Sequence, residues 1–211
     1  MIKLTPPKCD VSRVRILTKR LTPANAQARW DADSGRYKQF KEEITEQLLK
    51  IQGGRCAYCG CQLFGNPHRD HIAPKSPHYK WTFWPKNLVL SCPPCNVDFK
   101  KTFDPVVPYV GKRGYSKIEF SFVHPYLDDP KLHIKFIGHR LEILISTANS
   151  SAKGKVSIDL FDLTNVHRAK ERAMHAAFSR NVGFLQGRWK RLAEQITLAP
   201  LPRKLVLSKF G

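Results

Sequence analysis

The sequence predicts an α+β fold, with a small central core, helices before it and a mixed β/helical C-terminal extension after it. Two Cys-x-x-Cys pairs, Cys56 with Cys59 and Cys92 with Cys95, bound the proposed core. Apolar residues recur at helical spacing before this core, and period-two alternation recurs after it. We therefore expect three regions: 1–52, 53–105 and 106–211.

The cysteine pairs indicate a structural metal site. Each pair supplies two thiolates from a tight turn, and four thiolates suit tetrahedral Zn²⁺. We therefore predict that Cys56, Cys59, Cys92 and Cys95 bind a structural zinc ion. Of the remaining cysteines, Cys61 lies close enough in sequence to compete as a ligand, but we interpret it and Cys9 as non-ligands.

A second group of polar residues lies in and just after the interval between the cysteine pairs. Asp70 offers hard oxygen ligands, and the adjacent His71 is a base that titrates near neutral pH. Asn87 and Asn96 follow and supply neutral amides. We predict that zinc holds the backbone while oxygen ligands hold a separate, catalytic Mg²⁺ or Mn²⁺ ion.

The first region, 1–52, is predicted to be a basic arm followed by helices. The arm at 13–21 mixes arginines with aliphatic residues, and its pattern fits a short strand or a helix. Thr22 followed by proline predicts a helix start, with the helix running to residue 30. A stronger amphipathic pattern predicts a helix over 37–52 that ends at two glycines.

Within 53–105, we expect a strand at 69–73, a long loop at 74–85, a second strand at 87–91 and a helix at 96–103. The extension is predicted to contain strands, a polar loop and a long basic helix. The expected strands lie at 106–110, 117–123, 131–138 and 141–147, the loop at 149–154 and the helix at 164–196.

Composition points to a polyanionic partner. Lysine and arginine number 36 against 17 acidic residues, so the formal net charge is +19. An excess of this size is typical of nucleic-acid binding, and we favour DNA over RNA. The N-terminus lacks the apolar segment of a secretory signal, and no apolar run is long enough to span a membrane. We therefore expect a cytoplasmic protein with zinc-bound thiolates rather than disulfides.

The central segment resembles the HNH endonucleases of the ββα-metal type, in the subgroup whose motif is flanked by zinc knuckles. The matching residues are Cys56, Cys59, Asp70, His71, Ile72, Pro74, Asn87, Leu88, Cys92, Cys95, Asn96 and Lys100. The resemblance implies a zinc-stapled ββα-metal core that hydrolyses phosphodiester bonds. It implies His71 as general base, Asp70 and Asn96 as ligands of the catalytic cation, and Asn87 as a residue that positions the loop and His71.

Two points qualify these roles. Adjacent strand residues point to opposite faces, so Asp70 and His71 can serve one phosphate only where the strand twists or the substrate lies across it. Lys100 could contact a phosphate or be solvated, and both interpretations stay open. We interpret the histidines outside the motif, including His124 and His133, as non-catalytic.

A weaker resemblance extends into residues 124–136 and 158–173, which are similar to the PtuB-like HNH proteins of retron and Septu anti-phage systems. It implies a defence effector that works with a PtuA-like ATPase partner. The alternative is a non-catalytic, zinc-stapled module that binds nucleic acid or a partner protein. The intact set of Asp70, His71, Asn87 and Asn96 argues against a dead site.

Overall fold

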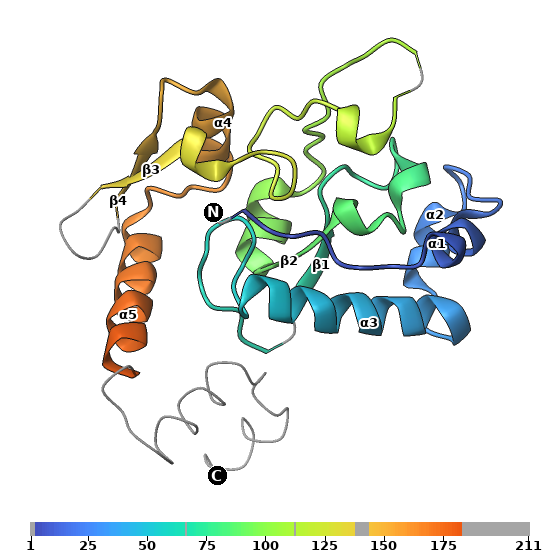
Figure 1. The fold of residues 1–211 in the computed structure, drawn as a ribbon, viewed down its shortest axis with the longest axis horizontal. Coiled ribbons are helices and arrows are strands. Elements are labelled where there is room, and N and C mark those ends of the chain that lie inside the picture. The colour runs from blue at the N-terminus through green and yellow to red at the C-terminus, as the bar shows by residue number, and fades with distance from the viewer. Residues whose placement is uncertain (1–2, 66, 112, 138–143, 183–211) are drawn as a thin grey trace.

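The computed structural model describes residues 3–65, 67–111, 113–137 and 144–182. Within them, helices and two small antiparallel hairpins form the predicted α+β fold (Figure 1). The helices α1 and α2 lie near one end of α3, and the β3–β4 hairpin lies with α4 on the opposite side. None of the helices in this part of the chain is both long and apolar enough to cross a membrane.

The N-terminal arm is helical. The helix α1 spans Val11–Thr18, and the Asp10 side chain caps it by accepting a hydrogen bond from the Ser12 amide. The next helix, α2, spans Ala26–Asp31, so the expected start at Thr22 is wrong. The reason is a turn, because the Asn25 carboxamide accepts from the Thr22 amide at 2.9 Å and delays the helix.

The long helix α3 spans Gly35–Gln52 and confirms the helix expected at 37–52. Its apolar stripe of Phe40, Ile44 and Leu48 is buried. Gly53 ends the helix in the left-handed conformation, with φ of +58°. The Gln52 side chain then donates to the Leu90 carbonyl at 2.8 Å and accepts from the Leu90 amide at 2.8 Å, which fixes α3 against the core hairpin.

The core hairpin pairs β1 (His68–His71) with β2 (Leu88–Ser91), with Asp70 opposite Val89. The helix that follows, η3 (Pro94–Lys100), is a π-helix rather than the α-helix expected at 96–103. It ends early because Lys101 takes a positive φ of +47°. Short 3₁₀ turns complete the core and its flank: η1 (Tyr79–Trp81), η2 (Pro85–Asn87) and η4 (Tyr115–Lys117).

The extension departs most from expectation. The strands expected at 106–110 and 117–123 are absent from this described part of the chain, where a single bridge joins Val106 and Phe120. The 3₁₀ turn η5 (Pro130–Leu132) leads into β3 (Ile134–Ile137), which pairs with β4 (Leu144–Thr147).

Two helices close the described chain. The expectation of a polar loop at 149–154 is wrong for its second half, because the helix α4 (Ala152–Leu160) starts there with Ser151 as its N-cap. The basic helix is confirmed as α5 (Val166–Val182), and residues 183–196 of that expectation lie outside the described residues.

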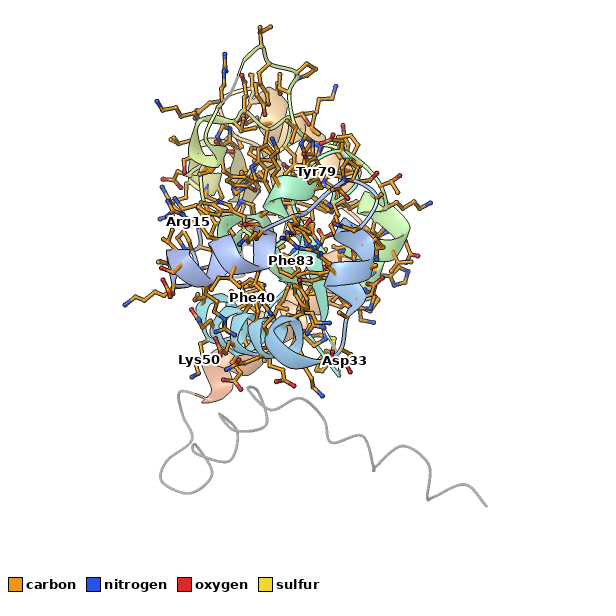
Figure 2. All side chains as sticks on the ribbon, turned by 90° about the vertical axis from the view of Figure 1, so that its right-hand side faces the viewer. Arg15, Asp33, Phe40, Lys50, Tyr79 and Phe83 are labelled. Carbon is orange, nitrogen blue, oxygen red and sulfur yellow. The ribbon has the colours of Figure 1, made fainter. Side chains whose placement is uncertain are left out.

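One apolar core includes residues from all three expected regions. Phe83 packs against α3 in this core, and its ring centroid lies 5.6 Å from that of Phe40 and 5.4 Å from that of Tyr37. Figure 2 shows Phe40 and Phe83 in the interior and Lys50 at the periphery. The extension joins the same core because Phe161 stacks on Tyr58 at 4.2 Å. The region boundaries at residues 52 and 105 stay a prediction.

Candidate active site and metal centre

The four predicted zinc ligands form one cluster. The Sγ atoms of Cys56, Cys59, Cys92 and Cys95 all lie within 4.8 Å of one another. The Cys59 and Cys92 sulfurs are 3.7 Å apart. A tetrahedral zinc site with Zn–S bonds of about 2.3 Å separates its sulfurs by about 3.8 Å, so the cluster suits zinc. Cys61 is buried nearby but lies outside this group.

An arginine from the extension contacts the cluster. The Arg168 guanidinium, on α5, donates to Cys95 Sγ at 3.3 Å and lies 4.7 Å from the ring centroid of Phe99. Four thiolates and one divalent ion would carry two net negative charges. The buried guanidinium offsets part of that charge. The sequence-based interpretation missed Arg168, because the basic pattern of α5 does not distinguish it from its solvated neighbours.

The first cysteine pair also positions Asp70. Tyr58 lies between Cys56 and Cys59 in the sequence, and its hydroxyl donates to Asp70 Oδ2 at 2.5 Å. Burial, followed by the adjacent carboxylate, raises the pKa of Tyr58 well above its usual range. The phenol therefore stays protonated and keeps donating to Asp70.

Lys100 holds the other side of the same carboxylate. Its ammonium lies 3.2 Å from Asp70 Oδ1 and donates to the His71 carbonyl oxygen at 2.7 Å. Both side chains are almost fully buried, with exposed fractions of 2% for Lys100 and 6% for Asp70. The solvated-lysine alternative is therefore wrong. The lysine is an internal counterion of Asp70.

The His71 ring lies on the other face of β1. Its Nε2 lies 2.9 Å from the Thr82 carbonyl oxygen, and its ring packs edge-on against Trp30 at 4.3 Å. Burial, with a smaller contribution from the charge of Lys75, moves the pKa of His71 well below its usual value. The imidazole is therefore neutral near pH 7. A carbonyl can only accept, so Nε2 carries the proton and Nδ1 holds the basic lone pair.

Asn96 lies on η3, beside the strand face that carries Asp70. Its Nδ2 donates to His68 Nδ1 at 3.1 Å, and within the described residues this is the one hydrogen bond of the Asn96 side chain. The amide oxygen is thus available to a cation. Asp70 Oδ1 and Oδ2 each accept one hydrogen bond, so each keeps a lone pair. This oxygen donor set fits a hard divalent ion.

Asn87 is completely buried and fastens the long loop. Its Oδ1 accepts from the Ala73 amide at 2.7 Å, and its Nδ2 donates to the carbonyls of Ala73 at 3.0 Å and Trp81 at 3.2 Å. Asn87 therefore closes both ends of the loop that leads to Thr82, the partner of His71. None of the hydrogen bonds of its side chain in the described structure joins it to Asp70 or to the cysteine cluster.

A hydrogen-bonded chain from the extension reaches Asn87. His124 Nδ1 accepts from the amides of Tyr126 and Leu127, so its Nε2 carries the proton and donates to the Tyr115 hydroxyl at 2.9 Å. Tyr115 in turn donates to Asn87 Oδ1 at 3.0 Å. Burial lowers the pKa of His124 to about 3, which keeps this direction fixed. Sequence-based reasoning assigned His124 no role, and no local motif marks this chain.

The structure thus brings the predicted residues together in two groups. Asp70 lies with Lys100 on the η3 side of β1, and Asn96 lies on the same helix. His71 lies with Thr82 on the α2 side, and Asn87 anchors the loop between them. The opposed faces of Asp70 and His71 follow from strand alternation.

Comparison with known proteins agrees with this geometry. Residues 56–101 match the family model described as HNH endonuclease. Fold and site thus define an HNH endonuclease domain within a longer chain.

The chain is also similar to the Septu protein PtuB of Bacillus mycoides (strain KBAB4). The two are 27% identical over 158 residues, which cover 65% of this chain and 52% of the relative. The match therefore spans about half the length of that relative. Both findings confirm the resemblance to HNH, PtuB-like proteins expected from the sequence.

Proposed function

We propose that this protein is a metal-dependent endonuclease that hydrolyses phosphodiester bonds, with His71 as general base. The His71 hydrogen bond to Thr82 carries the proposal most directly. It leaves Nδ1 unprotonated and fixes the ring, and a lowered pKa keeps that nitrogen ready to accept a proton.

The reaction begins when Nδ1 of His71 takes a proton from the attacking water. The positive charge that forms on the ring is then stabilised through Nε2–H by the Thr82 carbonyl. Asn87 keeps this carbonyl in place by fastening the surrounding loop. The scissile phosphate lies across the end of β1, which allows side chains of both strand faces to act on it.

Asp70 and Asn96 would hold the catalytic Mg²⁺ or Mn²⁺ ion. Such an ion supplies charge stabilisation to the phosphate and to the leaving oxygen. Tyr58 and Lys100 orient the Asp70 carboxylate toward this task. The cysteine cluster has the separate role of a structural zinc site, which holds the turn that carries Tyr58.

The net charge of +19 supports a nucleic-acid substrate, and we favour DNA over RNA. Similarity to the Septu protein PtuB supports a role as an effector of anti-phage defence, together with a PtuA-like ATPase partner. A partner that restrains cleavage is physically useful because so basic a chain binds nucleic acid with little selectivity. An association with retrons stays a prediction, as does a cytoplasmic location.

Cleavage of supercoiled plasmid and of total RNA tests this proposal, each with Mg²⁺, with Mn²⁺ or in buffer stripped of free divalent ions. We expect the plasmid to be cut only when a divalent ion is present. The Asn96→Ala variant should lose cleavage, whereas Asp98→Ala, an exposed position on the same helix, should not. Unchanged cleavage without divalent ions would contradict the mechanism.

The alternative is a non-catalytic module that binds nucleic acid or a partner. It would be favoured if neither polymer were cut by the protein alone or after coexpression with its ATPase partner.

A further inference from the structure

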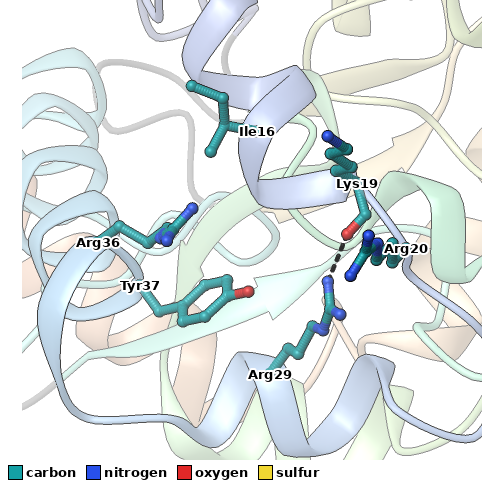
Figure 3. Close-up of a pocket in the computed structure, with 6 residues that line it drawn as sticks. All are labelled: Ile16, Lys19, Arg20, Arg29, Arg36 and Tyr37. Carbon is teal, nitrogen blue, oxygen red and sulfur yellow. Dashed lines mark hydrogen bonds between the residues drawn. The ribbon is translucent and has the colours of Figure 1, made fainter.

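A basic pocket lies among the N-terminal helices, on residues that the proposed chemistry does not use. Its volume is about 400 Å³, and its lining consists of Ile16, Lys19, Arg20, Arg29, Arg36 and Tyr37. Figure 3 shows these side chains arranged around a common hollow between α1, α2 and the start of α3. Four of the six carry a positive charge, and none is acidic.

The four cations lack acidic partners. No ion pair joins Lys19, Arg20, Arg29 or Arg36 to a carboxylate among the described residues. Arg29 instead donates to the Lys19 carbonyl at 2.5 Å, which aims its guanidinium into the hollow (Figure 3). Like charges gathered without counterions repel one another, so an anion bound among them is stabilised.

Hydrogen bonds hold the turn that carries Arg20. Arg20 takes a φ of +62°, a left-handed conformation in which glycine would be less strained. The turn is held in place because Asn25 Nδ2 donates to the Arg20 carbonyl at 3.0 Å while Asn25 Oδ1 accepts from the Thr22 amide. The locked turn therefore fixes the position of Arg20 beside the three other cations of the pocket.

The pocket is also close to the general base. Arg29 lines the pocket, and the next residue, Trp30, packs its ring against His71 at 4.3 Å. Tyr37 lines the pocket and packs on Phe83, which directly follows the Thr82 carbonyl that orients His71. Aromatic contacts therefore connect residues at the pocket with His71 and with the segment that orients it.

We propose that this pocket binds the phosphodiester backbone of the nucleic-acid substrate and holds the strand beside His71. The proposal rests on the proposed nuclease function and names a substrate contact for it. Arginine and lysine are the side chains that most often contact phosphate oxygens, and the pocket presents three arginines and one lysine. A phosphate contact positions the strand and carries no sequence information directly.

Binding of a fluorescent DNA duplex tests the pocket without cleavage. The zinc-loaded full chain carries His71→Ala in every arm, and affinity is measured by anisotropy over a series of salt concentrations. The pocket variant adds Arg20→Gln and Arg36→Gln. The control adds Lys131→Gln and Lys155→Gln, two exposed lysines on η5 and α4. The helix α4 lies on the opposite side of the molecule from α1 and α2 (Figure 1). Both pairs remove two positive charges.

The pocket variant should bind about tenfold more weakly near 150 mM salt, and its slope of log K against log salt should fall by about 1.8. The control should stay within about twofold of the parent. Equal losses in both variants would overturn the proposal, because net charge alone would explain them. Unchanged DNA affinity in the pocket variant would also overturn the proposal. In that case, binding of inorganic phosphate or ATP that the variant loses would show that the pocket takes a small anion instead of DNA.

Failure of the nuclease proposal gives a different pattern. A chain that never cuts nucleic acid would still show the selective loss of binding, whereas an active nuclease with an irrelevant pocket would not.

Discussion

Lys100 and Asp70 form a buried ion pair inside the HNH motif, with the ammonium 3.2 Å from Oδ1. The same ammonium donates to the His71 carbonyl at 2.7 Å, so one side chain from η3 contacts both motif residues of β1. The pair therefore joins the π-helix η3 to the strand β1. It also means that a cation at Asp70 shares the carboxylate with a lysine.

Replacement of Lys100 should be severely destabilising. Lys100→Met leaves the Asp70 carboxylate buried without a counterion, and we expect a loss of about 3–5 kcal/mol in the free energy of unfolding. Urea unfolding of the zinc-loaded protein measures it. The double variant Asp70→Asn/Lys100→Met should recover much of the loss. Lys38→Met, at an exposed position on α3, is the matched control and should be nearly neutral. If Lys100→Met lowered the free energy of unfolding no more than Lys38→Met does, Lys100 would not be the internal counterion of Asp70.

Two buried histidines should make stability depend on pH. Burial lowers the pKa of His124 to about 3, and burial together with Lys75 lowers that of His71, both from an ordinary value of 6.5. Below pH 6.5 the unfolded chain therefore binds more protons at these two histidines than the folded chain does. The free energy of unfolding is unaffected by their titration above pH 6.5 and declines as the pH falls below it. For His124 this decline continues to about pH 3.

Each histidine should contribute a slope that approaches about 1.4 kcal/mol per pH unit below pH 6. Urea unfolding at pH 7, 6 and 5 should therefore show a shallower decline for His124→Gln than for the parent protein. Parallel curves would mean that His124 binds protons equally in the folded and unfolded states, which would contradict the lowered pKa.

The contact between Arg168 and Cys95 should stabilise the metal centre. Arg168→Gln removes a charge that offsets the thiolates, and such outer contacts typically change metal affinity by about 10–100-fold. Zinc release to a chromogenic chelator should therefore be faster in this variant. Lys170→Gln, an exposed neighbour on α5, should release zinc as the parent does. Identical release from both variants would leave Arg168 without a role at the centre.

Tyr115 should influence catalysis from outside the motif. Tyr115→Phe removes the hydroxyl that joins His124 to Asn87 and leaves the buried His124 Nε2–H without its acceptor. We expect a stability loss of about 1–3 kcal/mol. A lower cleavage rate at saturating substrate, with unchanged DNA affinity and zinc content, would identify a positioning role. A change in DNA affinity alone would contradict it.

Features with a local signal were predictable from the sequence. The spacing of Phe40, Ile44 and Leu48 predicts α3 because helical periodicity is a property of neighbouring residues. The cysteine cluster was predictable because each Cys-x-x-Cys turn places its two sulfurs together before any tertiary contact forms.

Features that depend on distant contacts were not predictable. Lys100 finds Asp70 only when η3 packs on β1, and a lysine gives no sign of this in its local sequence. The start of α4 was misread because Ser151 and Gly154 are also typical of loops. Here the glycine serves packing, since a Cβ atom on Gly154 would lie 2.1 Å from the His133 carbonyl oxygen. The segment at 106–110 alternates like a strand, but Pro108 removes a ladder donor.

The most direct test is the single-turnover rate of plasmid cleavage by the parent protein, His71→Ala and His167→Ala at equal zinc content. His167 is an exposed histidine outside the motif and serves as the control. The mechanism predicts that cleavage is lost by at least about a hundredfold in His71→Ala and is retained in His167→Ala. Equal rates for all three proteins would contradict His71 as the general base.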